Sequence, residues 1–134
     1  MGLSTYLANA WLNHTFGKGA YSVPAHIYVG LSLADPTADG SGLSEPSGGS
    51  YARIEMDAAD WTAAADGSIE NAVAVAFATP TGDWGNISHV FLADASSGGN
   101  ILVSAPLPAV VEVINGSTPP TFAAGALRFS LPWE

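Results

Sequence analysis

The sequence predicts a mainly β protein, an antiparallel β-sandwich or jelly-roll-like domain with one N-terminal α-helix. Three observations favour this fold. Apolar residues recur at helical spacing near the N-terminus, about eight or nine short alternating runs follow, and turns rich in Gly, Asn, Asp and Pro separate those runs. The length of 134 residues suits one compact domain with its own core. We therefore expect a single domain over residues 1–134, with the helix within 1–17 and the sandwich over 18–134.

The helix is predicted to begin after Ser4 and to run to about His14. The Ser4 hydroxyl can accept a hydrogen bond from the first helical turn, and Gly17 can adopt the left-handed conformation in which helices commonly end. Apolar residues at helical spacing form one stripe. The stripe consists of Leu7, Ala8, Trp11 and Leu12. We expect it to pack against the sandwich or against a neighbouring subunit.

The first β-rich region contains two predicted strands and a long connection between them. Residues 25–33 alternate apolar with polar or small side chains, which is typical of a strand with two different faces. Residues 35–50 are rich in Gly, Pro, Ser and Asp, and connections of this length are commonly functional or mobile. A second strand is predicted over residues 51–57.

The remaining residues predict a hairpin and four further strands. Asp66-Gly67 favours a tight turn between residues 61–65 and a strand over 68–79. Further strands are expected over residues 87–94, 101–105, 109–114 and 126–131. Pro106 and Pro108 lack a backbone N–H, so we expect the strands on either side of them to be separate and edge-like or bent.

The composition excludes several classes of partner. Charged residues make up 11% of the chain, against about 25% in average soluble domains. With three cations and a net charge of −9, we expect binding neither to nucleic acid nor to an anionic membrane surface. We also expect no membrane span, because Gly, Pro, Ser or Asn interrupts every uncharged stretch. A chain that is 48% hydrophobic and poor in charge is expected to bury surface against other protein.

The sequence predicts no catalytic residue, no cofactor and no metal site, and we expect a non-enzymatic protein. The chain lacks cysteine and a Gly-x-Ser-x-Gly elbow. Three histidines on separate elements are expected to bond to polar neighbours rather than to a metal; they are His14, His26 and His89. Carboxylates close in sequence are expected to lie in loops or at a solvated edge, rather than to bind calcium or cleave glycosides. They are Asp35 and Asp39, and Glu55, Asp57 and Asp60.

Several stretches together resemble one known family over nearly the whole chain. They are Leu3-Ser-Thr-Tyr-Leu-Ala-Asn-Ala-Trp-Leu-Asn-His, Tyr28-Val-Gly-Leu-Ser, Ala34-Asp-Pro-Thr, Gly49-Ser-Tyr-Ala-Arg, Asp83-Trp-Gly-Asn-Ile-Ser-His, Asp94-Ala-Ser-Ser-Gly-Gly-Asn-Ile-Leu and Phe122-Ala-Ala-Gly-Ala-Leu. The combination resembles small single-domain virion proteins of tailed bacteriophages, usually labelled phage tail fibre proteins. The resemblance implies a structural component of the outer virion, made in the host cytoplasm, and it implies no catalytic residues.

Size and composition favour capsid decoration among the roles that this resemblance allows. A classical tail fibre is long and often repetitive, whereas this chain is compact and carries no evident repeat. We expect a cement protein on the outer head surface that binds the major capsid protein and itself, most simply as a homotrimer. A tail-fibre, tail-tip or adaptor protein in host attachment is the alternative, and a soluble sugar-binding lectin is less favoured. The expected interface residues are Leu7, Trp11, Leu12, Asp35, Asp39, Tyr51 and Trp84.

Overall fold

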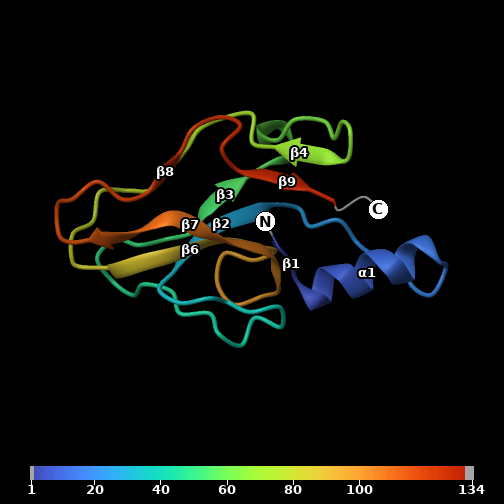
Figure 1. Ribbon diagram of the computed structural model, residues 1–134, viewed down its shortest axis with the longest axis horizontal. Coiled ribbons are helices and arrows are strands. Elements are labelled where there is room, and N and C mark those ends of the chain that lie inside the picture. The colour runs from blue at the N-terminus through green and yellow to red at the C-terminus, as the bar shows by residue number, and fades with distance from the viewer. Residues whose placement is uncertain (1, 132–134) are drawn as a thin grey trace.

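The computed structural model describes residues 2–131 and places a five-stranded antiparallel sheet at the centre of the molecule (Figure 1). The sheet has the order β1-β7-β6-β2-β3. Its strands are β1 (Gly2–Leu3), β7 (Ile101–Val113), β6 (Gly85–Ala93), β2 (Ile27–Ser32) and β3 (Ile54–Met56). β2 and β3 are shorter than the predicted strands 25–33 and 51–57. A strand extends only as far as its backbone pairs with a neighbouring strand, whereas the alternation of side chains continues beyond that point.

Two short antiparallel ribbons form a second layer over this sheet, so the predicted β-sandwich is confirmed. β4 (Ser68–Glu70) pairs with β9 (Arg128–Ser130), and β5 (Val75–Ala76) pairs with β8 (Thr121–Phe122). Apolar side chains from both layers meet in one core cluster. A smaller cluster on Phe91 and Ala93 includes Leu43, which brings the 35–50 segment onto other buried residues of the sheet.

The N-terminal helix is confirmed as α1 (Thr5–Thr15), with Ser4 as its N-cap. The Ser4 hydroxyl accepts a hydrogen bond from the Leu7 backbone N–H at 3.1 Å, and Gly17 follows the helix with a φ of 75°. The helix touches the body through its first turns and then projects from one end of the molecule (Figure 1). A short 3₁₀ helix, η1 (Ala58–Asp60), is a second helical element that the sequence analysis did not predict.

The prediction of two strands separated by Pro106 and Pro108 is wrong, since β7 runs through both prolines. The strand tolerates them because its ladder with β6 is irregular there. Ile87 is paired with Val111, whereas His89 is paired with Pro106, so β7 contains extra residues between these points. β1 pairs with β7 only at Val103 and Ser104, which leaves the proline segment at an edge of the sheet.

The predicted Asp66-Gly67 hairpin forms, but its second strand is interrupted. Both turn residues have positive φ, and Ala65 and Ser68 are bridged across the turn. The strand expected over 68–79 divides into β4 and β5, with Asn71 between them. The buried Asn71 amide bonds to the carbonyls of Val73 and Ala123 and accepts from the Leu127 N–H, so a side chain replaces the strand ladder at this point.

Over the described residues, no helix is both long and apolar enough to cross a membrane.

Candidate interaction surfaces

The structure divides the seven predicted interface residues between the core and the surface. Leu7 and Trp84 are 4% and 3% exposed and pack inside the domain. Tyr51 is partly buried and packs against Trp84, and Trp11 is partly buried with its ring edge towards Phe129. The exposed members are Leu12, Asp35 and Asp39. Contact between any of the seven residues and a partner stays a prediction.

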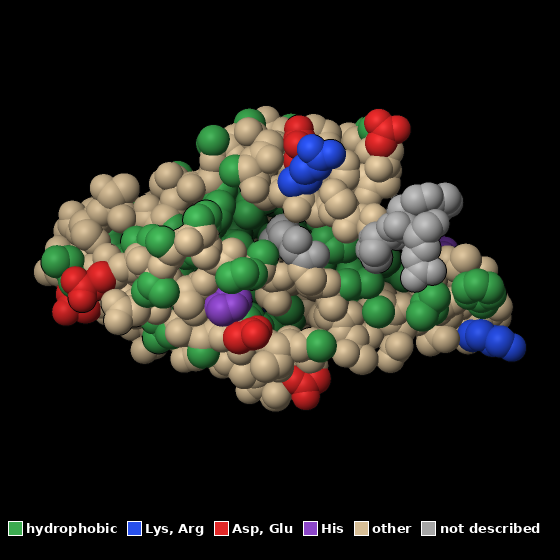
Figure 2. Space-filling view, in the orientation of Figure 1, with side chains coloured by type: hydrophobic (Ala, Val, Ile, Leu, Met, Phe, Trp, Pro, Cys, Tyr) green, Lys and Arg blue, Asp and Glu red, His purple; other side chains and the backbone are tan. Residues whose placement is uncertain are grey.

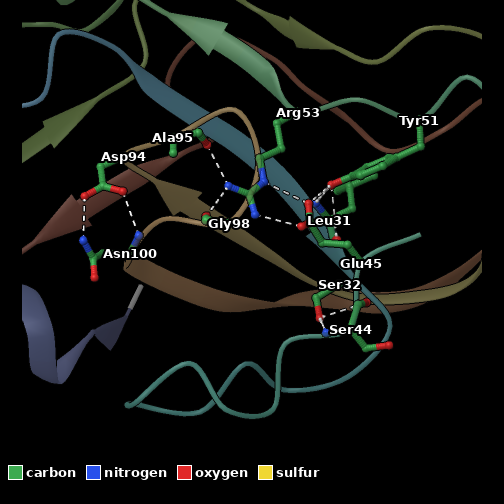
Figure 3. A network of polar contacts seen from close by, with 10 residues as sticks. All are labelled: Leu31, Ser32, Ser44, Glu45, Tyr51, Arg53, Asp94, Ala95, Gly98 and Asn100. Atoms are coloured by element: carbon green, nitrogen blue, oxygen red, sulfur yellow. Dashed lines mark hydrogen bonds and ion pairs between the residues drawn. The ribbon is translucent and has the colours of Figure 1, made fainter. Parts of the chain in front are cut away.

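The long 35–50 connection, which the sequence predicts to be functional or mobile, is anchored by a buried ion pair between Glu45 and Arg53 (Figure 3). Arg53 donates to both carboxylate oxygens of Glu45 at 3.0 and 2.8 Å, and its side chain is 2% exposed. The same guanidinium donates to the carbonyls of Ala95 and Gly98 at 2.7 and 3.0 Å. The Tyr51 hydroxyl donates a hydrogen bond to Glu45. Burial is the main cause that raises the pKa of the Tyr51 phenol. The Arg53 side chain thus joins the 35–50 segment to the distant turn that contains Ala95 and Gly98.

Further hydrogen bonds order the same connection. The buried Ser32 hydroxyl accepts from the Ser44 N–H at 3.1 Å. Asp39 accepts hydrogen bonds from the Ser41 N–H, the Ser41 hydroxyl and the Thr37 hydroxyl, and these bonds lower the pKa of Asp39 to about 2. Serine and threonine donors therefore engage this carboxylate in the manner typical of a turn.

A histidine and two carboxylates meet on the exposed edge formed by β2 and β3. His26 Nδ1 lies 2.6 Å from Asp57 Oδ1, and His26 Nε2 lies 3.9 Å from Glu55 Oε1. Tyr28 donates its hydroxyl to Glu55 at 3.1 Å. Because the two ring nitrogens face different carboxylates, this arrangement suits a histidine bridging two acids better than three ligands around one cation. His26 thus has the polar neighbours that the sequence analysis expected.

The other two histidines lie elsewhere. His14 Nδ1 accepts from the Tyr21 N–H at 3.1 Å, and His89 Nδ1 lies 2.8 Å from the Ser88 hydroxyl. Both contacts are local in sequence.

An apolar cavity of about 310 Å³ lies between α1 and the two layers of the sandwich. Leu7 and Trp11 of α1, Leu102 of β7 and Phe129 of β9 contribute to its wall. Trp61 also lines this cavity, and its buried indole N–H has no hydrogen-bond partner within the described part of the chain. Sequence reasoning did not single out the cavity, because the elements that surround it are distant along the chain.

A second hollow, which we call the β7 groove, lies between the proline segment of β7 and the β8 region. It has a volume of about 580 Å³, and hydrophobic side chains are visible in the recess there (Figure 2). Residues 105–109 and Val111 form one side, and residues 120–122, 126 and 127 form the other. None of these described lining residues has a titratable side chain. The groove is therefore suited to apolar protein surface rather than to a charged ligand.

The far end of α1 presents apolar side chains to solvent. We call residues 12–20 the helix tip, and every residue in it is exposed. Leu12 and Phe16 are 57% and 71% exposed. The tip is ordered by backbone bonds, since the N–H groups of Lys18 and Gly19 both donate to the Asn13 carbonyl, at 2.7 and 3.2 Å. This end of the predicted apolar stripe thus remains outside the domain core.

Comparison with known families gives one match that spans nearly all of the chain. The model of the family described as "Podophage GP4 fiber I protein gp80" matches residues 2–130. No curated protein matches significantly.

Proposed function

The chain belongs to the Podophage GP4 fiber I protein gp80 family, and from this premise we propose that it works in the tail-fibre apparatus of a tailed phage. The match supports the sequence-based assignment to phage virion proteins of the tail-fibre type. It favours the fibre alternative over the capsid decoration that size and composition favoured. The family description names a fibre, and this observation carries the proposal.

The proposed role is structural and consists of binding other virion proteins. Two surface features support it, the uncharged β7 groove and the exposed Leu12 and Phe16 of the helix tip. Surfaces poor in charge and rich in apolar side chains are typical of protein interfaces. The proposed partners are further copies of this chain and neighbouring tail components.

The number of copies in each virion tests this proposal against capsid decoration. Quantitative mass spectrometry of purified virions would compare this protein with the major capsid protein. A tail-fibre role predicts between a few and a few dozen copies, whereas a decoration protein covers the shell in hundreds. Immunogold labelling supplies a second measurement, with label expected at the tail. Hundreds of copies with label over the head would overturn the proposal.

A further inference from the structure

We propose that copies of this chain associate head to tail, with the helix tip of one copy seated in the β7 groove of the next. The inference depends on the geometry and charge of this chain and adds a specific contact to the proposed fibre role.

The helix tip has the properties of a preformed apolar anchor. Phe16 is 71% exposed, so most of its ring is available to a partner. The hydrogen bonds from Lys18 and Gly19 to Asn13 fix the turn that follows it, and the Tyr21 N–H bonds back to His14. An anchor that is already ordered loses little conformational freedom on binding. Aromatic side chains of this kind commonly contribute most to an interface.

The β7 groove has the properties of the matching receptor. Pro106, Pro108 and Pro120 contribute to its lining, and proline rings restrict how far the backbone there can rearrange. Leu107 and Phe122 contribute apolar surface on opposite sides. A volume of about 580 Å³ is sufficient for an aromatic side chain together with an aliphatic neighbour, such as Phe16 with Leu12.

The distribution of charge favours a second copy as the occupant. Lys18, in the helix tip, is the one charged side chain in residues 1–34, and all 12 acidic residues lie from Asp35 onward. Contact between the tip of one copy and the body of another therefore brings a cationic segment towards an acidic one. Contact between two bodies would instead bring like charges together. Complementary charge of this kind selects partners and orients their encounter.

The positions of the two features determine the type of assembly. The helix tip lies at one end of the long axis of the molecule, whereas β7 and β8 lie well away from that end, beyond the middle of the molecule (Figure 1). One chain therefore cannot fill its own groove, and contact between copies uses two different surfaces. Contacts of this type close into rings when the rotation between copies permits, and otherwise extend into filaments. The smallest closed assemblies that such a contact allows are a reciprocal dimer, in which each tip enters the groove of the other copy, and the expected homotrimer.

A mixing experiment with two variants tests the proposed contact. Phe16→Ser removes the anchor and leaves the groove intact, whereas Ala109→Asp places a charge in the groove and leaves the tip intact. Both residues are exposed, so neither change removes core packing. Sedimentation velocity should show self-association of the unmodified protein between about 1 and 100 µM, and each variant should weaken it by about tenfold or more.

The decisive sample is an equimolar mixture of the two variants. The intact tip of Ala109→Asp should enter the intact groove of Phe16→Ser, and the mixture should form dimers that grow no further. Phe16→Leu, which keeps an apolar anchor, and Ala63→Asp, an exposed change outside the groove, should associate as the unmodified protein does. If Ala109→Asp fails to fold, Thr121→Asp on the opposite side of the groove replaces it.

Three results would overturn the proposal. They are an unmodified protein that stays monomeric throughout the concentration range, variants that associate normally, and a mixture that forms no dimer. A monomeric protein would leave the groove to another tail component as its occupant. These outcomes are separate from the copy-number measurement, so a failure of the head-to-tail contact can be distinguished from a failure of the fibre role.

Discussion

Replacing Arg53 by methionine should destabilise the domain by about 3 kcal/mol or more. The substitution keeps a long apolar stem but removes the charge that joins the 35–50 segment to the sheet. Four hydrogen bonds are lost, two to Glu45 and one each to the carbonyls of Ala95 and Gly98. The stacking of the guanidinium over Phe91, at 5.0 Å from the ring centroid, is lost as well.

The expected magnitude follows from the burial of the pair. The Arg53 and Glu45 side chains are 2% and 23% exposed, so removal of Arg53 leaves a largely desolvated carboxylate without its cation. Breaking a buried pair in this way costs about 3–5 kcal/mol. We take the lower end of that range, since Glu45 keeps some solvent contact and the hydrogen bond from Tyr51.

Urea denaturation followed by tryptophan fluorescence measures this loss, and hydrogen exchange locates it. The Leu33 N–H, which donates to the Ser44 carbonyl, should exchange faster in Arg53→Met. Arg128→Met is the matched control: Arg128 is exposed and bonds to the Ser68 hydroxyl, so the cost should stay within about 0.5 kcal/mol.

A second variant separates the ion pair from simple loss of packing. Arg53→Met combined with Glu45→Gln removes the stranded charge and should recover part of the lost stability. A loss below about 1 kcal/mol in Arg53→Met, or unchanged exchange at the Leu33 N–H, would show that the ion pair does not hold the 35–50 segment.

Three further predictions follow from particular backbone and side-chain positions. Gly30→Ala would place a Cβ 2.3 Å from the ring of the fully buried Phe91 and should cost at least 1–3 kcal/mol by urea denaturation, with partial recovery in Gly30→Ala/Phe91→Leu. Gly67→Ala should lower the free energy of unfolding by about 1 kcal/mol, because Gly67 has a φ of +75° and an added Cβ would meet no other atom. Gly19→Ala is the control: its Cβ is equally unobstructed and its φ is not positive, so the change should be nearly neutral. Hydrogen bonds lower the pKa of Asp39 from 3.8 to about 2. The carboxylate therefore contributes stability above pH 3.8 that is lost as the pH falls through about 2. An NMR titration of the Asp39 side-chain carboxyl with a midpoint near 4 would contradict this prediction.

The fold class could be predicted because it depends on signals that are local in sequence. Ser4 and Gly17 are a cap and a terminator, and Asp66-Gly67 has the residues that a tight hairpin turn requires. Such features act within a few residues, so the sequence is sufficient to recognise them. The resemblance to tail-fibre proteins depended in the same way on short stretches along nearly the whole chain, and the match over residues 2–130 confirmed it.

The interior of the sheet could not be predicted in the same way. Pro106 and Pro108 disfavour a strand locally, but the bulge against β6 and the free edge of β7 remove the cost of their missing N–H groups. In the sequence, Arg53 is simply one polar residue of the predicted strand 51–57. Its stabilising role depends on hydrogen bonds to residues that are 8, 42 and 45 positions away. No local pattern specifies such partners, because chain topology brings them together.

The chain by itself determined a small β-rich domain with one capped helix, few charges and the stretches characteristic of a phage fibre family. Those properties depend on composition and on spacing over a few residues. The tertiary structure decided which apolar residues remain available to a partner. Leu7 and Leu12 belong to the same helical stripe, yet Leu7 packs in the core and Leu12 is 57% exposed, because the helix extends beyond the sheet that covers its first turns. Exposure depends on how the elements pack together, and helical periodicity carries no information about where that packing ends.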